Sequence, residues 1–142
     1  MKSVIEAFLR GELEPPPVAR FLGMRLVSGG EGEATMELDA RPEFANPMGT
    51  VQGGIICALV DAAMGFAFAS TVEDGESFTT LELKTNYLRP FWDGTLSARG
   101  WVVSRGRSVG LTECEVKDAE GRLVAHSTST CMILRGEQAK GR

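Results

Sequence analysis

The segment from Asn46 to Val72 constrains the fold more than any other part of the chain. A loop with glycine and proline leads into Gly53-Gly54, and the residues that follow are apolar or small except for one acid, Asp61. Because no proline or loop cluster interrupts them, they predict a helix that begins near Gly53. A helix with apolar residues on nearly all faces is buried, either in a protein core or in a membrane.

Strand patterns on both sides of this helix favour a core over a membrane. A carboxylate at mid-helix, such as that of Asp61, is costly inside a bilayer. Alternation of apolar and polar residues predicts strands at 24–28, 33–39, 78–88, 94–104, 108–118 and 123–134. We therefore expect an α+β protein, with an antiparallel sheet wrapped around one long central helix that it covers only in part.

Finer features of the elements also follow from the sequence. The first two strands are expected to join across Gly29-Gly30, and Leu81, Leu83, Thr85 and Tyr87 are expected on one face of their strand. Residues 1–17 predict a short amphipathic helix at 3–10, packed on the body, and a proline-rich linker, and a helical turn is expected around 18–22. Residues 136–142 predict a frayed tail. The whole chain, 1–142, is expected to form one domain.

Charge and cysteine content narrow the functional classes. The net charge of -4 argues against a general nucleic-acid surface. Cys57, Cys114 and Cys131 are far apart and odd in number, which predicts reduced core thiols and neither a disulfide set nor a metal site. Residues 1–10 lack an export signal, so we expect a cytoplasmic protein.

Asp61 and the glycine pair are the residues with chemical potential. The amides at a helix start attract a carbonyl oxygen or an oxyanion, and Gly53 and Gly54 leave them uncovered; equally, the pair could serve only tight packing. An acid in an apolar helix without a nearby cation predicts a functional carboxylate, against a purely structural one. Asp61 follows Gly53 by eight positions, or about 12 Å along a helix. We therefore expect one site to combine Gly53 of one chain with Asp61 of another, in a homodimer.

Several short motifs occur in a fixed order: Asn46, Gly49, Gly53-Gly54 and Asp61, then Asn-Tyr-Leu-Arg-Pro at 86–90, Ser-Arg-Gly-Arg-Ser at 104–108, and Gly-Arg-Leu-Val-Ala at 121–125. In this order they resemble the hotdog-fold acyl-CoA thioesterases, in particular the phenylacetic-acid-degradation thioesterase branch. The resemblance extends from about Phe21 to Leu134. It implies the hotdog fold and the hydrolysis of a medium-chain or aromatic acyl-CoA to a free acid and coenzyme A.

The resemblance also implies a role for each matching residue. Asp61 would be the nucleophile or the general base, the Gly53 amide would hold the oxyanion, and Asn46 would help to place the water or the thioester. Contacts with the substrate are implied at Gly54, Thr80, Glu82, Asn86, Tyr87, Arg89, Pro90, Ser104, Arg105, Gly106 and Arg107, the arginines meeting phosphates. No metal or cofactor is implied, since coenzyme A is part of the substrate.

One residue departs from the family pattern. Gln52 stands before the glycine pair, where the family has a histidine. Glutamine forms hydrogen bonds but exchanges no proton near neutral pH, so Gln52 would orient a water or the thioester while Asp61 alone titrates. The only histidine, His126, is expected to be a sheet residue. The hydroxyl run at 127–130 is expected on a surface strand, because no His-Asp pair accompanies it.

Two other functions remain open at this stage. The chain could be a non-catalytic acyl-CoA-binding protein in which Gln52 marks lost catalysis. A hotdog hydratase would need an Asp/His pair at the helix, and no histidine is present there. The exposed apolar surface of a partly covered helix predicts a dimer or a dimer of dimers. No nucleic-acid or membrane partner is expected.

Overall fold

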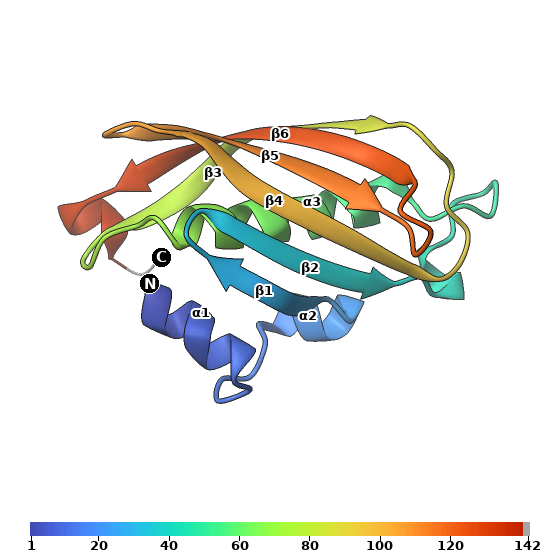
Figure 1. The fold of residues 1–142 in the computed structure, drawn as a ribbon, viewed down its shortest axis with the longest axis horizontal. Helices are drawn as coiled ribbons and strands as arrows, with labels where there is room; N and C mark the ends of the chain where they lie inside the picture. Colours follow the sequence, from blue (N-terminus) through green and yellow to red (C-terminus); the bar gives the residue numbers. More distant parts are fainter. Residues whose placement is uncertain (141–142) are drawn as a thin grey trace.

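The computed structural model describes residues 1–140 as one sheet packed around one long helix (Figure 1). The helices are α1 (Lys2–Leu9), α2 (Pro17–Leu22) and α3 (Gly53–Ala69), with short 3-10 turns η1 (Pro42–Phe44) and η2 (Gly136–Ala139). The strands are β1 (Arg25–Gly30), β2 (Glu33–Asp39), β3 (Ser77–Tyr87), β4 (Thr95–Arg105), β5 (Val109–Lys117) and β6 (Leu123–Leu134). Every predicted helix and strand is present, with boundaries within three residues of those expected.

The six strands form a single antiparallel sheet in the order β1-β2-β4-β5-β6-β3. Strands β1 and β3 are its edges. One face packs on α3, and Leu96, Ala98 and Gly100 of β4 lie on that face. Gly100 is required there, because a Cβ atom at this position would lie 2.8 Å from the Ala63 carbonyl oxygen.

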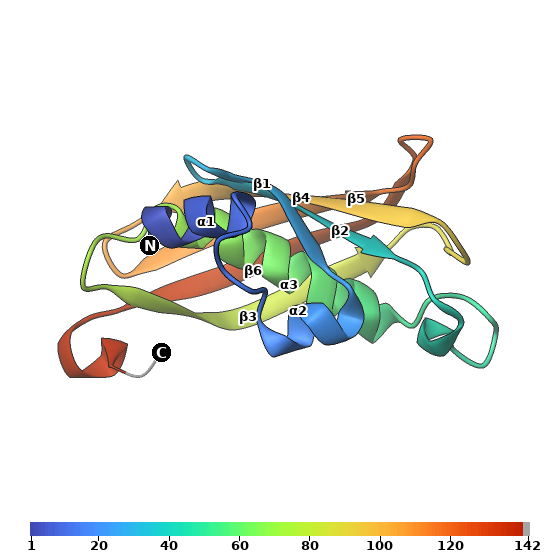
Figure 2. The same ribbon diagram turned by 90° about the horizontal axis from the view of Figure 1, so that it is seen from below.

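The sheet covers only part of α3. Leu59, Val60, Ala63, Ala67 and Phe68 are fully buried, whereas Gly54 and Asp61 are exposed. The expectation of a helix buried on all sides is therefore wrong for the single chain, and that of partial cover is correct. Figure 2 shows α1 and α2 along β1, which is an edge strand of the sheet. Within residues 1–140, no helix combines the length and the apolar character that a membrane crossing requires.

Hydroxyl groups end α3 earlier than the apolar pattern predicts. Ser70 Oγ donates to the Ala67 carbonyl at 2.7 Å, and Thr71 Oγ1 donates to the Phe68 carbonyl at 2.8 Å. These bonds satisfy two of the carbonyl groups that a helix end leaves free. The helix thus stops at Ala69, three residues before Val72.

The turn between β1 and β2 lies two residues beyond the predicted glycine pair. Gly29 and Gly30 belong to β1, and the chain reverses at Glu31 and Gly32, whose φ angles are +52° and +82°. Positive φ at both central residues is the conformation of the tight turn that suits a twisted hairpin. Glycine occupies only the second of these positions, and at the first Glu31 adopts the positive φ angle.

A bulge in β3 changes which residues face the helix. The pairing of β3 with β6 shifts between Thr80 and Glu82, so Leu81 has no partner. Leu81 is 55% exposed, whereas Leu83 packs on the core. The expectation that Leu81 and Leu83 share a face is therefore wrong, because a bulge adds one residue to the strand and reverses its alternation.

The remaining expectations have mixed outcomes. Cys114 and Cys131 are buried free thiols, as expected, whereas Cys57 is only half-buried. Ser127 and Ser129 face the core, so the expectation of a surface strand holds only for the threonines between and after them. In the predicted frayed tail, 136–139 instead form η2, and residues 141–142 lie outside the described part.

Candidate active site

Asp61 lies on the open face of α3, at the middle of the helix. Its carboxylate is exposed in the single chain, and Thr80 Oγ1 donates a hydrogen bond to its Oδ1 at 3.1 Å. The bulge beside Thr80 allows this contact, because it keeps Thr80 and Leu83 on the helix side of β3. Among residues 1–140, no cation pairs with Asp61. A held but unpaired carboxylate is available to accept a proton.

An apolar pocket of about 370 Å³ opens beside this carboxylate. We call it the carboxylate pocket. Its walls are Val4 and Phe8 of α1, Gly65 and Phe66 of α3, and Phe78 of β3, with Asp61 and Thr80 at one end. Its volume is in the range of about 300–1,000 Å³ typical of small-molecule sites.

Tyr87 occupies the space beside Gly53, at the other end of the open face. Its hydroxyl donates to the Gly53 carbonyl at 2.8 Å and lies 3.1 Å from the Cys57 sulfur. A Cβ atom on Gly53 would lie 2.7 Å from this hydroxyl, which explains the glycine by packing. Burial of the hydroxyl, together with the Cys57 thiol, raises the pKa of Tyr87 to about 12, although half of the side chain is exposed.

Gly54 is the more accessible of the two glycines. No atom lies within 4 Å of the position of a Cβ on Gly54, and among residues 1–140 neither the Gly53 nor the Gly54 amide donates a hydrogen bond. Gln52 caps the helix with its backbone, and its side chain is exposed. Two free amides at the start of a helix form a site for a carbonyl oxygen or an anion.

Asn46 organises the loop that precedes α3. Its Oδ1 accepts hydrogen bonds from the Met48 amide at 2.9 Å and the Thr50 amide at 3.2 Å, and its Nδ2 donates to Thr50 Oγ1 at 2.8 Å. These bonds hold the loop closed in the single chain. Asn46 also lines a pocket of about 420 Å³ with Gly53, Tyr87 and Arg89, which we call the amide pocket.

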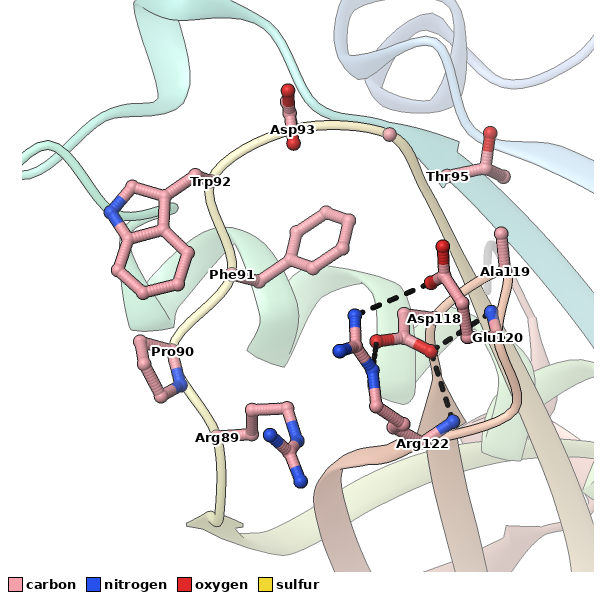
Figure 3. Close-up of a pocket in the computed structure, with 11 residues that line it drawn as sticks. Arg89, Pro90, Phe91, Trp92, Asp93, Thr95, Asp118, Ala119, Glu120 and Arg122 are labelled. Atoms are coloured by element: carbon pink, nitrogen blue, oxygen red, sulfur yellow. Dashed lines mark hydrogen bonds and ion pairs between the residues drawn. The ribbon is translucent and has the colours of Figure 1, made fainter.

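Arg89 belongs both to the amide pocket and to a neighbouring pocket that Figure 3 shows. In the pocket of Figure 3, Arg122 forms ion pairs with Asp118, at 2.7 Å between Nε and Oδ2, and with Glu120, at 3.3 Å between Nη2 and Oε2. The guanidinium of Arg89 has no such partner among residues 1–140. Arg89, next to the exposed Pro90, is therefore a free cation close to the start of α3.

Arg105 and Arg107 lie at the opposite end of the molecule. Arg105 donates to Thr71 Oγ1 at 3.3 Å and lies 3.4 Å from Glu76, so the structure engages it just beyond the end of α3. Ser104 is exposed near the end of β4, and Gly106 and Arg107 are exposed in the β4–β5 turn. The structure thus separates these residues from Arg89 by the length of α3, about 25 Å at 1.5 Å per residue.

The other residues predicted from the sequence lie outside the carboxylate pocket and the amide pocket. Glu82 and Asn86 are exposed on edge strand β3. His126 lies on the outer face of the sheet, with Nε2 3.7 Å from Glu113, so it is a sheet residue as expected. Sequence reasoning did not foresee the Tyr87–Gly53 contact or the pocket under α1, since both join segments distant in the chain.

The sheet order, with one long helix against one face of the sheet and a carboxylate on the helix's open side, defines a hotdog-fold protein. The sequence profile of the thioesterase superfamily matches residues 48–125, more than half of the chain, which include α3 and strands β3 to β5. The chain belongs to the thioesterase superfamily, and it is a thioester hydrolase.

Individual relatives agree with this assignment. A candidate esterase of Saccharolobus solfataricus is 34% identical over 141 residues, which cover 99% of this chain and 97% of that protein. The 1,4-dihydroxy-2-naphthoyl-CoA hydrolase of Listeria monocytogenes is 25% identical, over 80% of this chain and 93% of that protein. The crystal structure of a phenylacetic acid degradation-related protein from Ralstonia eutropha, a candidate thioesterase, matches with TM-score 0.82 and 37% identity, over 90% of this chain and 98% of that one.

Proposed function

We propose that this thioester hydrolase acts on an acyl-CoA with a medium-chain or aromatic acyl group, using Asp61 as the titrating residue. The placement of Asp61 carries the proposal: its carboxylate is solvent-accessible, held by Thr80 at 3.1 Å, and next to an apolar pocket. The names of the Listeria and Ralstonia relatives, which refer to an aromatic acyl-CoA and to phenylacetic acid degradation, support the substrate class.

We also propose that two chains share each site. The free amides of Gly53 and Gly54 are about 12 Å along the helix from Asp61, so one thioester carbonyl cannot contact both groups of one chain. Two α3 helices packed antiparallel on their open faces bring the start of one near Asp61 of the other, giving two equivalent sites. The unpaired edge of β3, with exposed Leu81 in the strand and exposed Leu88 just beyond it, supports a dimer on this side.

Two chemical routes are compatible with this arrangement. As a general base, Asp61 takes a proton from water while the water oxygen attacks the thioester carbon, and the α3 amides hold the oxyanion. The C–S bond then breaks, and coenzyme A leaves as a thiol with the proton from Asp61. As a nucleophile, the carboxylate displaces coenzyme A to form an anhydride, which water hydrolyses. Neither route requires a metal or cofactor.

The arginines fit the coenzyme A part of this proposal. Arg89 lies near the start of α3, and Arg107 lies beyond its end. Antiparallel pairing of two helices would bring these opposite ends together, so one coenzyme A could meet Arg89 of one chain and the β4–β5 turn of the other. Charge-assisted hydrogen bonds to phosphates favour such contacts. Gln52, exposed beside the free amides, can orient a water or the thioester.

The first experiment measures thiol release from straight-chain and aryl acyl-CoAs by the wild type and Asp61→Asn. We expect the substitution to lower kcat by about a hundredfold or more, the scale for a positioned acid-base group. Glu43→Gln, an exposed acid outside both pockets, is the control and should keep full activity. Equal rates for wild type and Asp61→Asn would remove Asp61 from the chemistry, and an inactive wild type that binds acyl-CoA would favour the non-catalytic binding function.

A second experiment tests the shared site. Gly54→Pro removes one free amide at a position with open space, in the first helical turn where proline is tolerated. Asp61→Asn and Gly54→Pro homodimers should each be inactive. Co-expression at equal levels should restore about a quarter of wild-type activity, because half of the dimers are mixed and each mixed dimer has one intact site. Co-expressed chains that stay inactive would place the complete site within one chain.

A further inference from the structure

The carboxylate pocket is closed on its outer side by α1. Figure 2 shows α1 beside the C-terminal half of α3, next to β1. The ring of Phe8 packs edge-on against Phe66 of α3, with centroids 6.0 Å apart and planes at 85°. The wall on this side of the pocket is thus formed by a segment distant in sequence from Asp61.

α1 is fixed to the body by a specific apolar contact. Ile5 is 2% exposed, and its Cγ2 lies 3.0 Å from the position that a Cβ on Gly29 would occupy. Ile5 therefore fills the space that the glycine of β1 leaves free. Ile5 also lines the pocket, but its contact with Gly29 does not involve Phe8, so Phe8 can be changed without removing this anchor of α1.

The side chains that line the pocket favour an uncharged group. Of the lining residues within 1–140, Asp61 and Thr80 alone have polar side chains, and both lie at the same end. A charged group beside Val4, Phe8 and Phe78 would lose its hydration without gaining a side-chain partner, which is strongly unfavourable. The α-ammonium group of Met1, which also lines the pocket, lies 3.8 Å from Asp74 Oδ1. An apolar chain or ring, by contrast, gains from leaving water.

Small residues mark positions along the pocket at one-turn intervals. Gly65 and Ala69 follow Asp61 at spacings of four residues on α3, and both line the pocket. Residues four apart lie on one helix face, about 6 Å from each other. A side chain added at Gly65 would therefore meet a bound group about 6 Å beyond the carboxylate.

We propose that the carboxylate pocket binds the acyl part of the substrate, with α1 as its outer wall, and that Phe8 and Gly65 determine the acyl length. This inference rests on the proposed function, because it places the thioester carbonyl at Asp61. The substrate class it defines is an acyl or aryl group without a distal charge. An acyl-CoA that ends in a second carboxylate is expected to be a poor substrate, because the side chains beyond Asp61 and Thr80 are apolar.

The test compares kcat/KM for a series of straight-chain acyl-CoAs, phenylacetyl-CoA and succinyl-CoA. Gly65→Leu should lower the ratio of long-chain to short-chain kcat/KM by roughly 10–200-fold, the range for fitting or excluding hydrocarbon in an apolar pocket. Phe8→Ala should raise that ratio and extend the accepted length. Phe21→Ala, which removes a ring that is 76% exposed on α2 and outside the pocket, is the matched control and should leave the profile unchanged.

Binding of non-hydrolysable S-alkyl thioethers of coenzyme A gives a second readout. Their affinities in Gly65→Leu, or in the milder Gly65→Ala if the leucine variant does not fold, should fall with chain length relative to wild type. Unchanged length profiles in folded variants, or efficient hydrolysis of succinyl-CoA, would overturn the inference while leaving the function intact. If the wild type hydrolyses none of the series, the proposed function fails first, and thioether binding still tests the pocket.

Discussion

Substitution of glycine by alanine is expected to have opposite effects on stability at Gly65, which belongs to α3, and at Gly100, which contacts it. Gly65 lies in the interior of the helix, where glycine is about 1 kcal/mol less favourable than alanine. A Cβ there would have a single neighbour, the Phe78 Cζ at 3.9 Å, which is an ordinary contact. Because nothing opposes the gain in helix propensity, Gly65→Ala should stabilise the protein by about 0.5–1 kcal/mol.

The stabilisation can be measured by thermal and urea unfolding. Unfolding entropy is about 2.1 cal/mol/K per residue, so for 142 residues a gain of about 1 kcal/mol corresponds to a rise in Tm of about 3 °C. The urea midpoint should rise without a change in slope. In the same variant, kcat/KM for the longest acyl-CoAs should fall, since the methyl group takes space in the carboxylate pocket.

Gly100→Ala is the matched comparison. Its Cβ would lie 2.8 Å from the Ala63 carbonyl and the Met64 amide nitrogen, which are backbone atoms of α3. Helix and sheet would have to move apart, and overpacking of this kind costs about 1–3 kcal/mol. A lower Tm for Gly65→Ala, or an unchanged Tm for Gly100→Ala, would refute the reasoning from local space.

Three further outcomes follow from the structure. Tyr87 is the only tyrosine, so absorbance titration of tyrosinate reports this site directly, and the titration midpoint should lie near pH 12 and not near 10. Because the pKa of Tyr87 is higher in the folded than in the unfolded state, the contribution of this group to stability is complete below about pH 10 and is lost as the pH rises to about 12. Asp118→Ala removes the acceptor of two turn amides and of Arg122, and should lower the unfolding free energy in urea by about 1–3 kcal/mol, with a smaller loss for Asn. Thr80→Val removes the hydrogen bond to Asp61 and should lower kcat with little change in KM. Thr80→Ser retains the hydroxyl group and should keep the wild-type kcat. An equal loss of kcat in both variants would assign Thr80 a packing role.

The elements could be predicted from the sequence because their signals are local. Apolar content and the absence of breakers located α3, and alternation located the strands. The end of α3 and the turn at Glu31 were missed, because hydroxyl capping and positive φ at a non-glycine residue leave weak signals in composition. The bulge at Leu81 was missed because strand alternation assumes an uninterrupted pairing.

The candidate site was predictable only in part, because only some of its features are local in the sequence. Asp61 and the amides of the glycine pair stand out chemically within one segment of the chain. The contacts that define their surroundings are long-range: Tyr87 meets Gly53, Thr80 meets Asp61, and Phe8 meets Phe66. No local pattern encodes such pairings, so they require the fold.

The bulge in β3 has a consequence for the tolerance of this strand to insertions and deletions. In a regular strand, losing one residue exchanges the inward and outward positions of everything on one side of the loss. In β3 the extra residue, Leu81, already separates two segments of opposite alternation, and both segments present the correct side chains to α3. Deleting Leu81 would make the pairing with β6 regular and leave Thr80 and Leu83 two positions apart, so both would still face the helix. Leu81 is thus a position at which β3 can lose one residue without exchanging its inward and outward side chains.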